Sequence, residues 1–125
     1  MFRKISTIII WSANWRKLAY WYQDIFNFKV IEEINHPYDT GILWELPEGG
    51  VHLWVGQHSK IKGKNKDPLR IMFNLDVRSV DEAYKYLLTK KVKVIAKPFK
   101  APTFDKYFAT FSDPEGNTFQ IIGPA

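Results

Sequence analysis

The sequence contains no cysteine, which excludes disulfide bonds, thiolate metal ligands and a cysteine nucleophile. Long apolar runs are also missing, because the stretch Ile8–Trp11 is far shorter than the ~20 residues that a membrane-spanning helix needs. The first residues lack the basic start, apolar run and small-residue cleavage site of a secretory signal. We therefore expect a cytoplasmic protein that does not contact a membrane.

Familiar catalytic motifs are absent as well. No glycine-rich phosphate loop, nucleophile elbow or HExxH zinc motif occurs in the chain. The 125 residues, of which 46% are hydrophobic and 25% charged, are typical of one globular domain or of two half-domains that share a core. Because no motif identifies the function, we infer it from the expected fold and from the side chains that line its cavity.

Basic residues are in excess, with 18 Lys and Arg against 13 Asp and Glu and a net charge of +5. Such an excess can attract nucleic acid, anionic lipid or an acidic small molecule. Much of it lies in the segment Lys60–Lys66, which we interpret as a solvated linker. A nucleic-acid surface would interleave basic and aromatic residues along an ordered groove, so nucleic acid is not the expected partner.

Aromatic residues make up 16% of the chain, with five Trp, six Tyr and nine Phe. Most of these rings are expected in the core, since large rings bury much apolar surface. A chain of this length has little interior for so many rings. We therefore expect some of them to line a cavity for a flat or apolar ligand.

The two halves of the sequence resemble each other. The run Ala19–Tyr22 and the run Ala83–Tyr86 share the pattern AYxY, and each is followed at the same spacing by the residues Lys-Val-Ile. In both copies a helical segment leads into a β-rich segment. This internal match predicts a duplicated unit.

Hydrophobic periodicity supports the duplication. Helical spacing predicts one helix over residues 15–26, with Asn14 as N-cap, and a second from the N-cap Ser79 to about residue 90. Alternation predicts strands over residues 4–11, 28–34, 41–46, 51–56, 69–77, 92–97, 106–112 and 117–122. We thus expect an α+β fold of two βαβββ units, residues 1–58 and 68–125, joined by the Lys-rich linker 59–67.

Two segments carry a resemblance to a known family. The run Phe111–Ile122 contains the turn Asp113-Pro114-Glu115-Gly116-Asn117 before the last strand, and the run Ala19–Phe28 places an aromatic pair before a short apolar stretch. With the repeat, the whole chain resembles the vicinal oxygen chelate superfamily, which includes glyoxalases, dioxygenases and bleomycin-resistance proteins. The resemblance implies two curved mixed sheets that form a cup, with the helices outside.

The same resemblance locates the family's metal ligands on the first and last strands of each half. In this chain those positions fall on Thr7, Trp54, Met72 (or Ile71, if the register slips by one) and Gln120. A divalent ion requires three or four converging carboxylates or imidazoles. A hydroxyl, an indole, a thioether and an amide do not form such a set, so we predict no metal and no other cofactor.

Alternation along the strands predicts which side chains face the cup. Ile8, Ile10 and the set Ile71, Phe73, Leu75 and Val77 are expected beneath the helices. The predicted ligand-binding lining consists of Thr7, Trp11, His52, Trp54, Met72, Asn74, Thr118 and Gln120. Trp11 and Trp54 are expected to be close together, with Trp54 offering a stacking face.

This lining favours reversible, metal-independent binding of a small apolar or aromatic molecule, as in resistance by sequestration. The basic chain favours a neutral or anionic ligand. The resemblance also implies a homodimer. Two alternatives stay open: a glyoxalase-like lyase or isomerase that uses displaced metal ligands or His52, and an interaction module that uses the surface of the fold.

Few residues could replace the metal in catalysis. His52 is the weak candidate for an acid or base, because an imidazole titrates near neutral pH, and Asp76 could be its partner. Glu45 lies on the third strand, where alternation does not decide which way its side chain faces, and a surface role is favoured. His36 and His58 are placed in loops and carry no functional signal.

Overall fold

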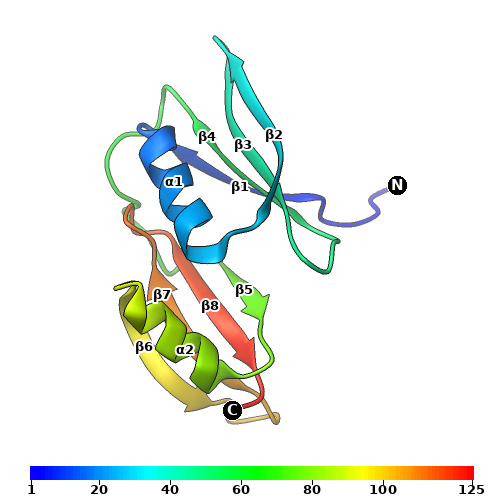
Figure 1. The fold of residues 1–125 in the computed structure, drawn as a ribbon, viewed down its shortest axis with the longest axis vertical. Helices are drawn as coiled ribbons and strands as arrows, with labels where there is room; N and C mark the ends of the chain where they lie inside the picture. The colour runs from blue at the N-terminus through cyan, green and yellow to red at the C-terminus, as the bar shows by residue number, and fades with distance from the viewer. The chain divides into compact units, whose positions relative to one another are not determined.

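The computed structural model describes all residues from Met1 to Ala125 and contains ten helices and strands. The chain divides into two compact units, Met1–Gly63 and Lys64–Ala125. Each unit runs strand, helix, strand, strand, strand, which confirms the predicted pair of βαβββ modules (Figure 1). The repeat in the sequence therefore corresponds to a repeat in structure.

The first unit builds a four-stranded sheet, sheet 1, in the order β1-β4-β3-β2. Strands β1 and β4 are parallel, whereas β4, β3 and β2 are antiparallel neighbours. The elements are β1 (Thr7–Ser12), α1 (Trp15–Phe26), β2 (Lys29–His36), β3 (Asp39–Glu45) and β4 (His52–Gln57). His36 thus ends a strand, which corrects its expected place in a loop.

The second unit repeats this topology in sheet 2, ordered β5-β8-β7-β6, with β5 and β8 parallel. Its elements are β5 (Met72–Asp76), α2 (Val80–Thr89), β6 (Lys93–Lys100), β7 (Tyr107–Ser112) and β8 (Thr118–Gly123). The first of these strands is shorter than expected. Ile71 lies outside it and is 82% exposed, so its predicted place beneath the helix is wrong.

Helix α1 covers one face of sheet 1 and contacts β1, β3 and β4. Its buried side chains recur every three or four residues, as an amphipathic helix requires. They are Trp15, Leu18, Ala19, Tyr22 and Ile25. The residues of the sheet that pack against the helix are all buried: Ile10, Ile42, Trp44, Leu53 and Val55. This layer is the core of the first unit.

The N-terminus of α1 is capped differently from the prediction. Asn14 occupies the N-cap position, but its side chain makes no capping hydrogen bond. The side chain of Gln57, at the end of β4, accepts from the backbone N–H of Trp15 at 3.2 Å and donates to the carbonyl oxygen of Ala13 at 2.8 Å. A side chain of β4, which is distant in the sequence, therefore supplies the hydrogen-bond acceptor that the first turn of the helix lacks.

Helix α2 begins as predicted. The Ser79 hydroxyl accepts from the backbone N–H of Glu82 at 3.2 Å, which is a standard N-cap bond. The helix buries Val80 and Leu87. It contacts β6, β7 and β8, where Phe111 and Phe119 are completely buried and stack at 5.5 Å between ring centroids.

The turn before β8 is held by one carboxylate. Asp113 Oδ1 accepts from the backbone N–H groups of Glu115 and Asn117, and Asp113 Oδ2 accepts from the side-chain amide of Asn117. Gly116 has a φ of +83°, a conformation that side chains with a Cβ disfavour. These bonds give the turn a structural role.

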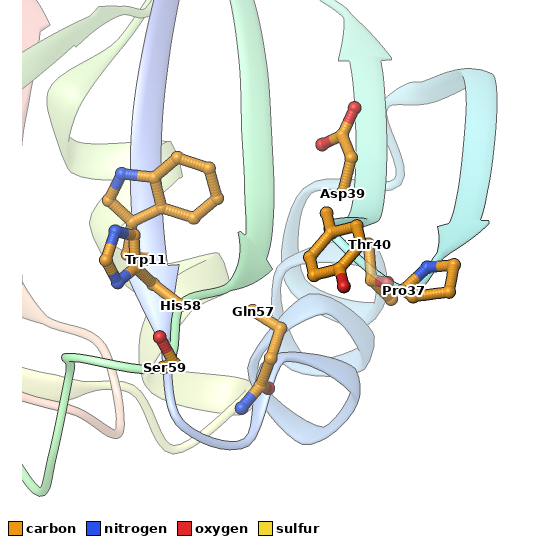
Figure 2. Close-up of a pocket in the computed structure, with 8 residues that line it drawn as sticks. Trp11, Pro37, Asp39, Thr40, Gln57, His58 and Ser59 are labelled. Atoms are coloured by element: carbon orange, nitrogen blue, oxygen red, sulfur yellow. The ribbon is translucent and has the colours of Figure 1, made fainter.

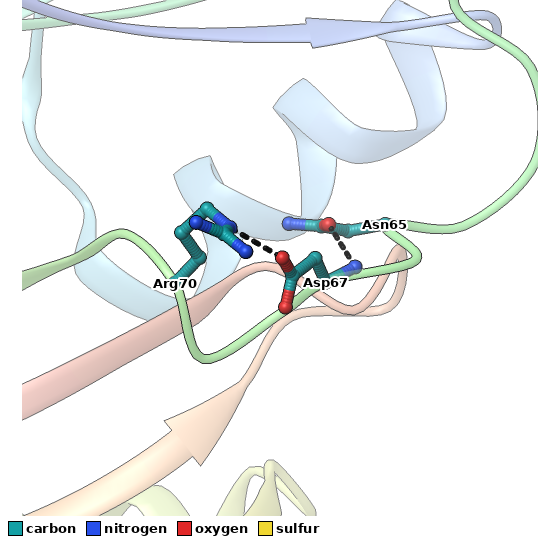
Figure 3. Close-up of polar contacts among 3 residues, drawn as sticks. All are labelled: Asn65, Asp67 and Arg70. Carbon is teal, nitrogen blue, oxygen red and sulfur yellow. Dashed lines mark hydrogen bonds and ion pairs between the residues drawn. The ribbon is translucent and has the colours of Figure 1, made fainter.

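Part of the Lys-rich segment is hydrogen-bonded to this turn, although residues 62–67 are exposed to solvent. The backbone N–H of Asn65 donates to the carbonyl oxygen of Glu115, and its side chain donates to Asn117. Figure 3 shows the next contacts, in which Asp67 N–H donates to Asn65 Oδ1 and Arg70 pairs with Asp67. The solvated linker predicted over residues 59–67 is therefore ordered in its second part.

Candidate functional site

Sheet 1 has one face that α1 leaves uncovered, here called the open face. Because side chains alternate along a strand, the neighbours of the buried residues Ile10, Leu53 and Val55 point to it. The predicted residues on this face are Thr7 and Trp11 of β1 and His52 and Trp54 of β4. The strand register brings them together, since Thr7 pairs with His52 and Ile9 with Trp54.

The two indoles of the open face are in contact. The ring centroids of Trp11 and Trp54 lie 6.3 Å apart at an interplanar angle of 77°, which confirms the predicted proximity. Their exposure differs, however. Trp54 is 7% exposed and Trp11 is 37% exposed. The accessible aromatic surface is therefore that of Trp11, and Trp54 packs against it from within.

Trp54 lies over a pair of glycines. Gly41 and Gly56 face each other across β3 and β4, and a Cβ added to either would collide with the Trp54 ring. The absence of two side chains thus makes room for an indole flat on the sheet. Its Nε1 is buried without a hydrogen-bond partner, which costs about 1–3 kcal/mol relative to a satisfied donor.

A pocket with a volume of about 580 Å³ opens beside Trp11. In Figure 2, Trp11 and His58 lie on one side of it, and Pro37, Asp39 and Thr40 lie on the other. Ser59 lies below His58 on the Trp11 side, and Gln57 lies between the two groups. The complete lining is Trp11, Pro37, Tyr38, Asp39, Thr40, Gln57, His58 and Ser59.

The topology explains why these segments meet. Parallel pairing brings the carboxyl ends of β1 and β4 to the same edge of the sheet, and antiparallel pairing brings the start of β3 there as well. Trp11 and Asp39 accordingly lie at one edge although they are distant in sequence. Of the lining residues, the sequence predicted Trp11 alone.

His58 is the most informative of the residues that sequence reasoning missed. Its backbone N–H donates to the Ser12 carbonyl oxygen at 3.0 Å, which extends the pairing of β1 and β4. Its ring lies 5.3 Å from that of Trp11 between centroids. The parallel pairing of the first and last strands was the available signal, because it makes the residue after β4 a neighbour of the end of β1.

The His58 ring also contacts the backbone beside it. His58 Nδ1 accepts from the backbone N–H of Lys60 at 3.1 Å. His36 repeats this arrangement on the other side of the pocket, where its Nδ1 accepts from the backbone N–H of Tyr38 at 3.1 Å.

The opposite end of the open face carries a polar row. The register pairs Thr7 with His52, His52 with Glu45, and Glu45 with Lys29. Glu45 also forms an ion pair with Lys29 at 3.9 Å. Glu45 therefore shares the face of His52, which settles the orientation that the sequence left open.

The other predicted residues lie in the second unit, on the face of sheet 2 that α2 does not cover. Met72 pairs with Thr118 and Asn74 with Gln120, so the register favours Met72 over Ile71. Thr118 is buried, and its hydroxyl donates to the Pro68 carbonyl oxygen at 2.6 Å. Gln120 donates to the Thr110 hydroxyl at 2.9 Å. Asp76 ends β5 beside Ile122, without a histidine in register.

The side chains present do not fit a metal ion. Nowhere in the chain do three or more His, Asp or Glu side chains gather closely enough to hold one. The positions that the resemblance assigns to ligands hold the hydroxyl of Thr7, the indole of Trp54, the thioether of Met72 and the amide of Gln120. Indole nitrogen is only a donor, and a single neutral amide oxygen does not hold a divalent ion.

Comparison with solved structures shows the same fold. The chain is similar to a glyoxylase/bleomycin resistance protein/dioxygenase domain from Frankia sp. EAN1pec, with a TM-score of 0.79, 14% identity and all of both chains covered. It is also similar to a member of that superfamily from Sphaerobacter thermophilus, with a TM-score of 0.79, 20% identity and 98% of each chain covered. The chain is also similar to a glyoxalase family protein from Enterococcus faecalis, with a TM-score of 0.78 and 18% identity. The match covers 97% of this chain and 98% of that chain.

No curated protein matches the sequence, and neither helix has the length and apolar composition needed to cross a membrane. The sequence does match one protein family over residues 4–121, nearly its whole length. The paired βαβββ units, the closing turn and this match give one conclusion. The chain belongs to the Glyoxalase/Bleomycin resistance protein/Dioxygenase superfamily.

Proposed function

We propose that this protein binds a small apolar or aromatic molecule without a metal ion, in the pocket beside Trp11 on the open face of sheet 1. The observation that carries the proposal is the 37% exposed indole of Trp11 in the wall of a pocket of about 580 Å³. That volume lies within the range of about 300–1,000 Å³ that is usual for small-molecule sites.

The surroundings of Trp11 support a stacking role. Trp54 and His58 both contact its ring. A ring held on two sides loses little conformational freedom when a ligand stacks on it, which favours binding. The hydroxyl, amide and carboxylate groups of the lining can then orient the ligand through hydrogen bonds.

Binding without chemistry suits the donor set described above. A protein of this kind acts by holding its ligand away from other targets, and resistance by sequestration is one such role. The binding residues in this proposal are Trp11 and the other residues of the pocket. The predicted residues Met72, Asn74, Thr118 and Gln120 lie in the second unit and outside this lining, so they have no part in this proposal.

Replacement of Trp11 tests the proposal. Small aromatic compounds are screened by thermal shift, and the best of them is titrated calorimetrically. Stacking contributes about 0.5–1.5 kcal/mol beyond area burial, so Trp11→Ala should weaken binding at least several-fold, and Trp11→Phe should restore part of it.

Trp21→Ala is the matched control, because Trp21 lies on α1 and is not part of the pocket. Its affinity for the same compound should equal that of the wild type. Equal affinity of Trp11→Ala and wild type, or the absence of any binding compound, would reject the proposed site.

A second candidate function is proton transfer by His52. The observation in its favour is the row in which Glu45 and Thr7 flank His52 on neighbouring strands, since a carboxylate beside an imidazole can orient it as a base. Exchange of the α-protons of hydroxyacetone with solvent deuterium, followed by NMR, tests this activity. This candidate function requires that the exchange rate with the wild-type protein exceeds the rate in buffer alone, and that the rate falls in His52→Gln.

A further inference from the structure

The lining of the Trp11 pocket has one formal charge, and that charge is negative. Asp39 is the single carboxylate in the lining, and no lysine or arginine contributes to it. Asp39 forms no ion pair within the chain. Figure 2 shows its carboxylate across the opening from Trp11. The pocket therefore has an unpaired anion on the side facing its main aromatic ring.

The other large side chains of the lining are rings. Trp11 and Tyr38 each present a π system to the pocket, and indole is the side chain that attracts cations most strongly. His58 adds a third ring to the lining. The lining therefore combines aromatic surface with one carboxylate and contains no lysine or arginine.

From this lining we infer that the ligand of the pocket is an organic cation, in which an ammonium group is attached to a small apolar or aromatic body. The inference rests on the proposed function and adds the charge of the ligand to it. The ammonium group lies between the Trp11 ring and the Asp39 carboxylate. The apolar body contacts Pro37 and the remaining face of the indole.

The positive net charge of the chain does not decide the ligand. Charges separated by more than the Debye length, about 8 Å at physiological ionic strength, are largely screened. The net charge of +5 is a property of the whole chain, whereas the ligand contacts Asp39 and the aromatic rings directly. An anionic ligand would meet this carboxylate without a basic partner in the pocket.

Three compounds of similar shape and different charge test the inference by calorimetric titration of the full chain: benzyltrimethylammonium, benzyl alcohol and phenylacetate. A cation–π contact changes affinity about two- to thirtyfold, from exposed to desolvated sites. The expected order of affinity is cation, then neutral compound, then anion, with the cation at least fivefold ahead of the neutral compound.

Variants separate the charge of the ligand from the existence of the site. Asp39→Asn should lower the affinity for the cation several-fold and leave the affinity for benzyl alcohol unchanged, whereas Trp11→Ala should lower both affinities. Glu48→Gln, in a turn outside the lining, should change neither.

The cation inference would be overturned if benzyl alcohol or phenylacetate bound as tightly as benzyltrimethylammonium, or more tightly. If Trp11→Ala still abolished that binding, the proposed site would stand. Failure of all three compounds to bind would overturn the cation inference. Failure of the whole aromatic screen as well would reject the proposed site with it.

Discussion

The two indoles of the open face have different physical tasks. Trp54 is buried over Gly41 and Gly56, where its contacts with the sheet stabilise the first unit. Trp11 keeps accessible surface in a pocket and is free to contact a ligand. Two residues of one type on one face therefore differ in exposure, with Trp54 as a packing residue and Trp11 as the residue that we propose binds the ligand.

This division predicts the effect of truncating Trp54. Trp54→Ala should lower the free energy of unfolding by about 2–4 kcal/mol, because a buried Trp→Ala change costs about 3–5 kcal/mol and removal of the unpartnered N–H returns part of it. Denaturant unfolding measures the loss. Trp54→Phe should cost less, since it keeps a ring over the glycines and removes the same N–H. Unchanged stability of Trp54→Ala would show that the indole is not a packing element.

At the scale of elements, helix α1 depends on β4 for its first turn. Helices leave their first N–H groups unsatisfied, and a neighbouring side chain usually accepts from them. Here the acceptor is Gln57, which also donates to the chain just before the helix. The same glutamine lines the pocket. The helix start and the edge of the site are thus linked by one side chain.

We expect Gln57→Ala to destabilise the protein by about 0.5–2 kcal/mol, the usual cost of a lost N-cap. Asn14→Ala is the matched comparison, because its side chain makes no capping bond, and its effect should stay within about 0.5 kcal/mol. Both values come from urea unfolding monitored by circular dichroism. A larger loss for Asn14→Ala than for Gln57→Ala would contradict the capping role of the glutamine.

At the scale of the whole molecule, the family scaffold is present and a ligand set for its metal is not. The match extends over residues 4–121, yet no three His, Asp or Glu side chains come together. The fold therefore does not by itself imply the chemistry of its relatives, since function depends on the side chains that a scaffold carries. The homodimer expected from the resemblance stays a prediction.

The donor set predicts the metal content of the purified protein. Zinc, manganese, iron and nickel should each be far below one ion per chain by plasma mass spectrometry. Chelators should leave the melting temperature unchanged, because bound metal would otherwise contribute to folding stability. One tightly held ion per chain, removed by a chelator with loss of stability, would overturn the metal-independent proposal.

The sequence by itself determined the features that depend on neighbouring residues. Helical spacing gave the bounds of α1, the Ser79 hydroxyl capped α2, and Asp113 and Gly116 shaped the closing turn. Alternation also gave the side of β1 that carries Trp11 and the side of β4 that carries Trp54, although their contact depends on the register of the two strands. Such features involve few residues, so local pattern is sufficient to specify them.

The tertiary structure decided the features that join distant segments. Gln57 replaced Asn14 as the helix cap, and Glu45 joined the face of His52. Pairing of β1, β3 and β4 brought His58 and Asp39 to the pocket of Trp11. The physical reason is that exposure and contact across strands depend on the register of the whole sheet, which the period of a single strand does not contain.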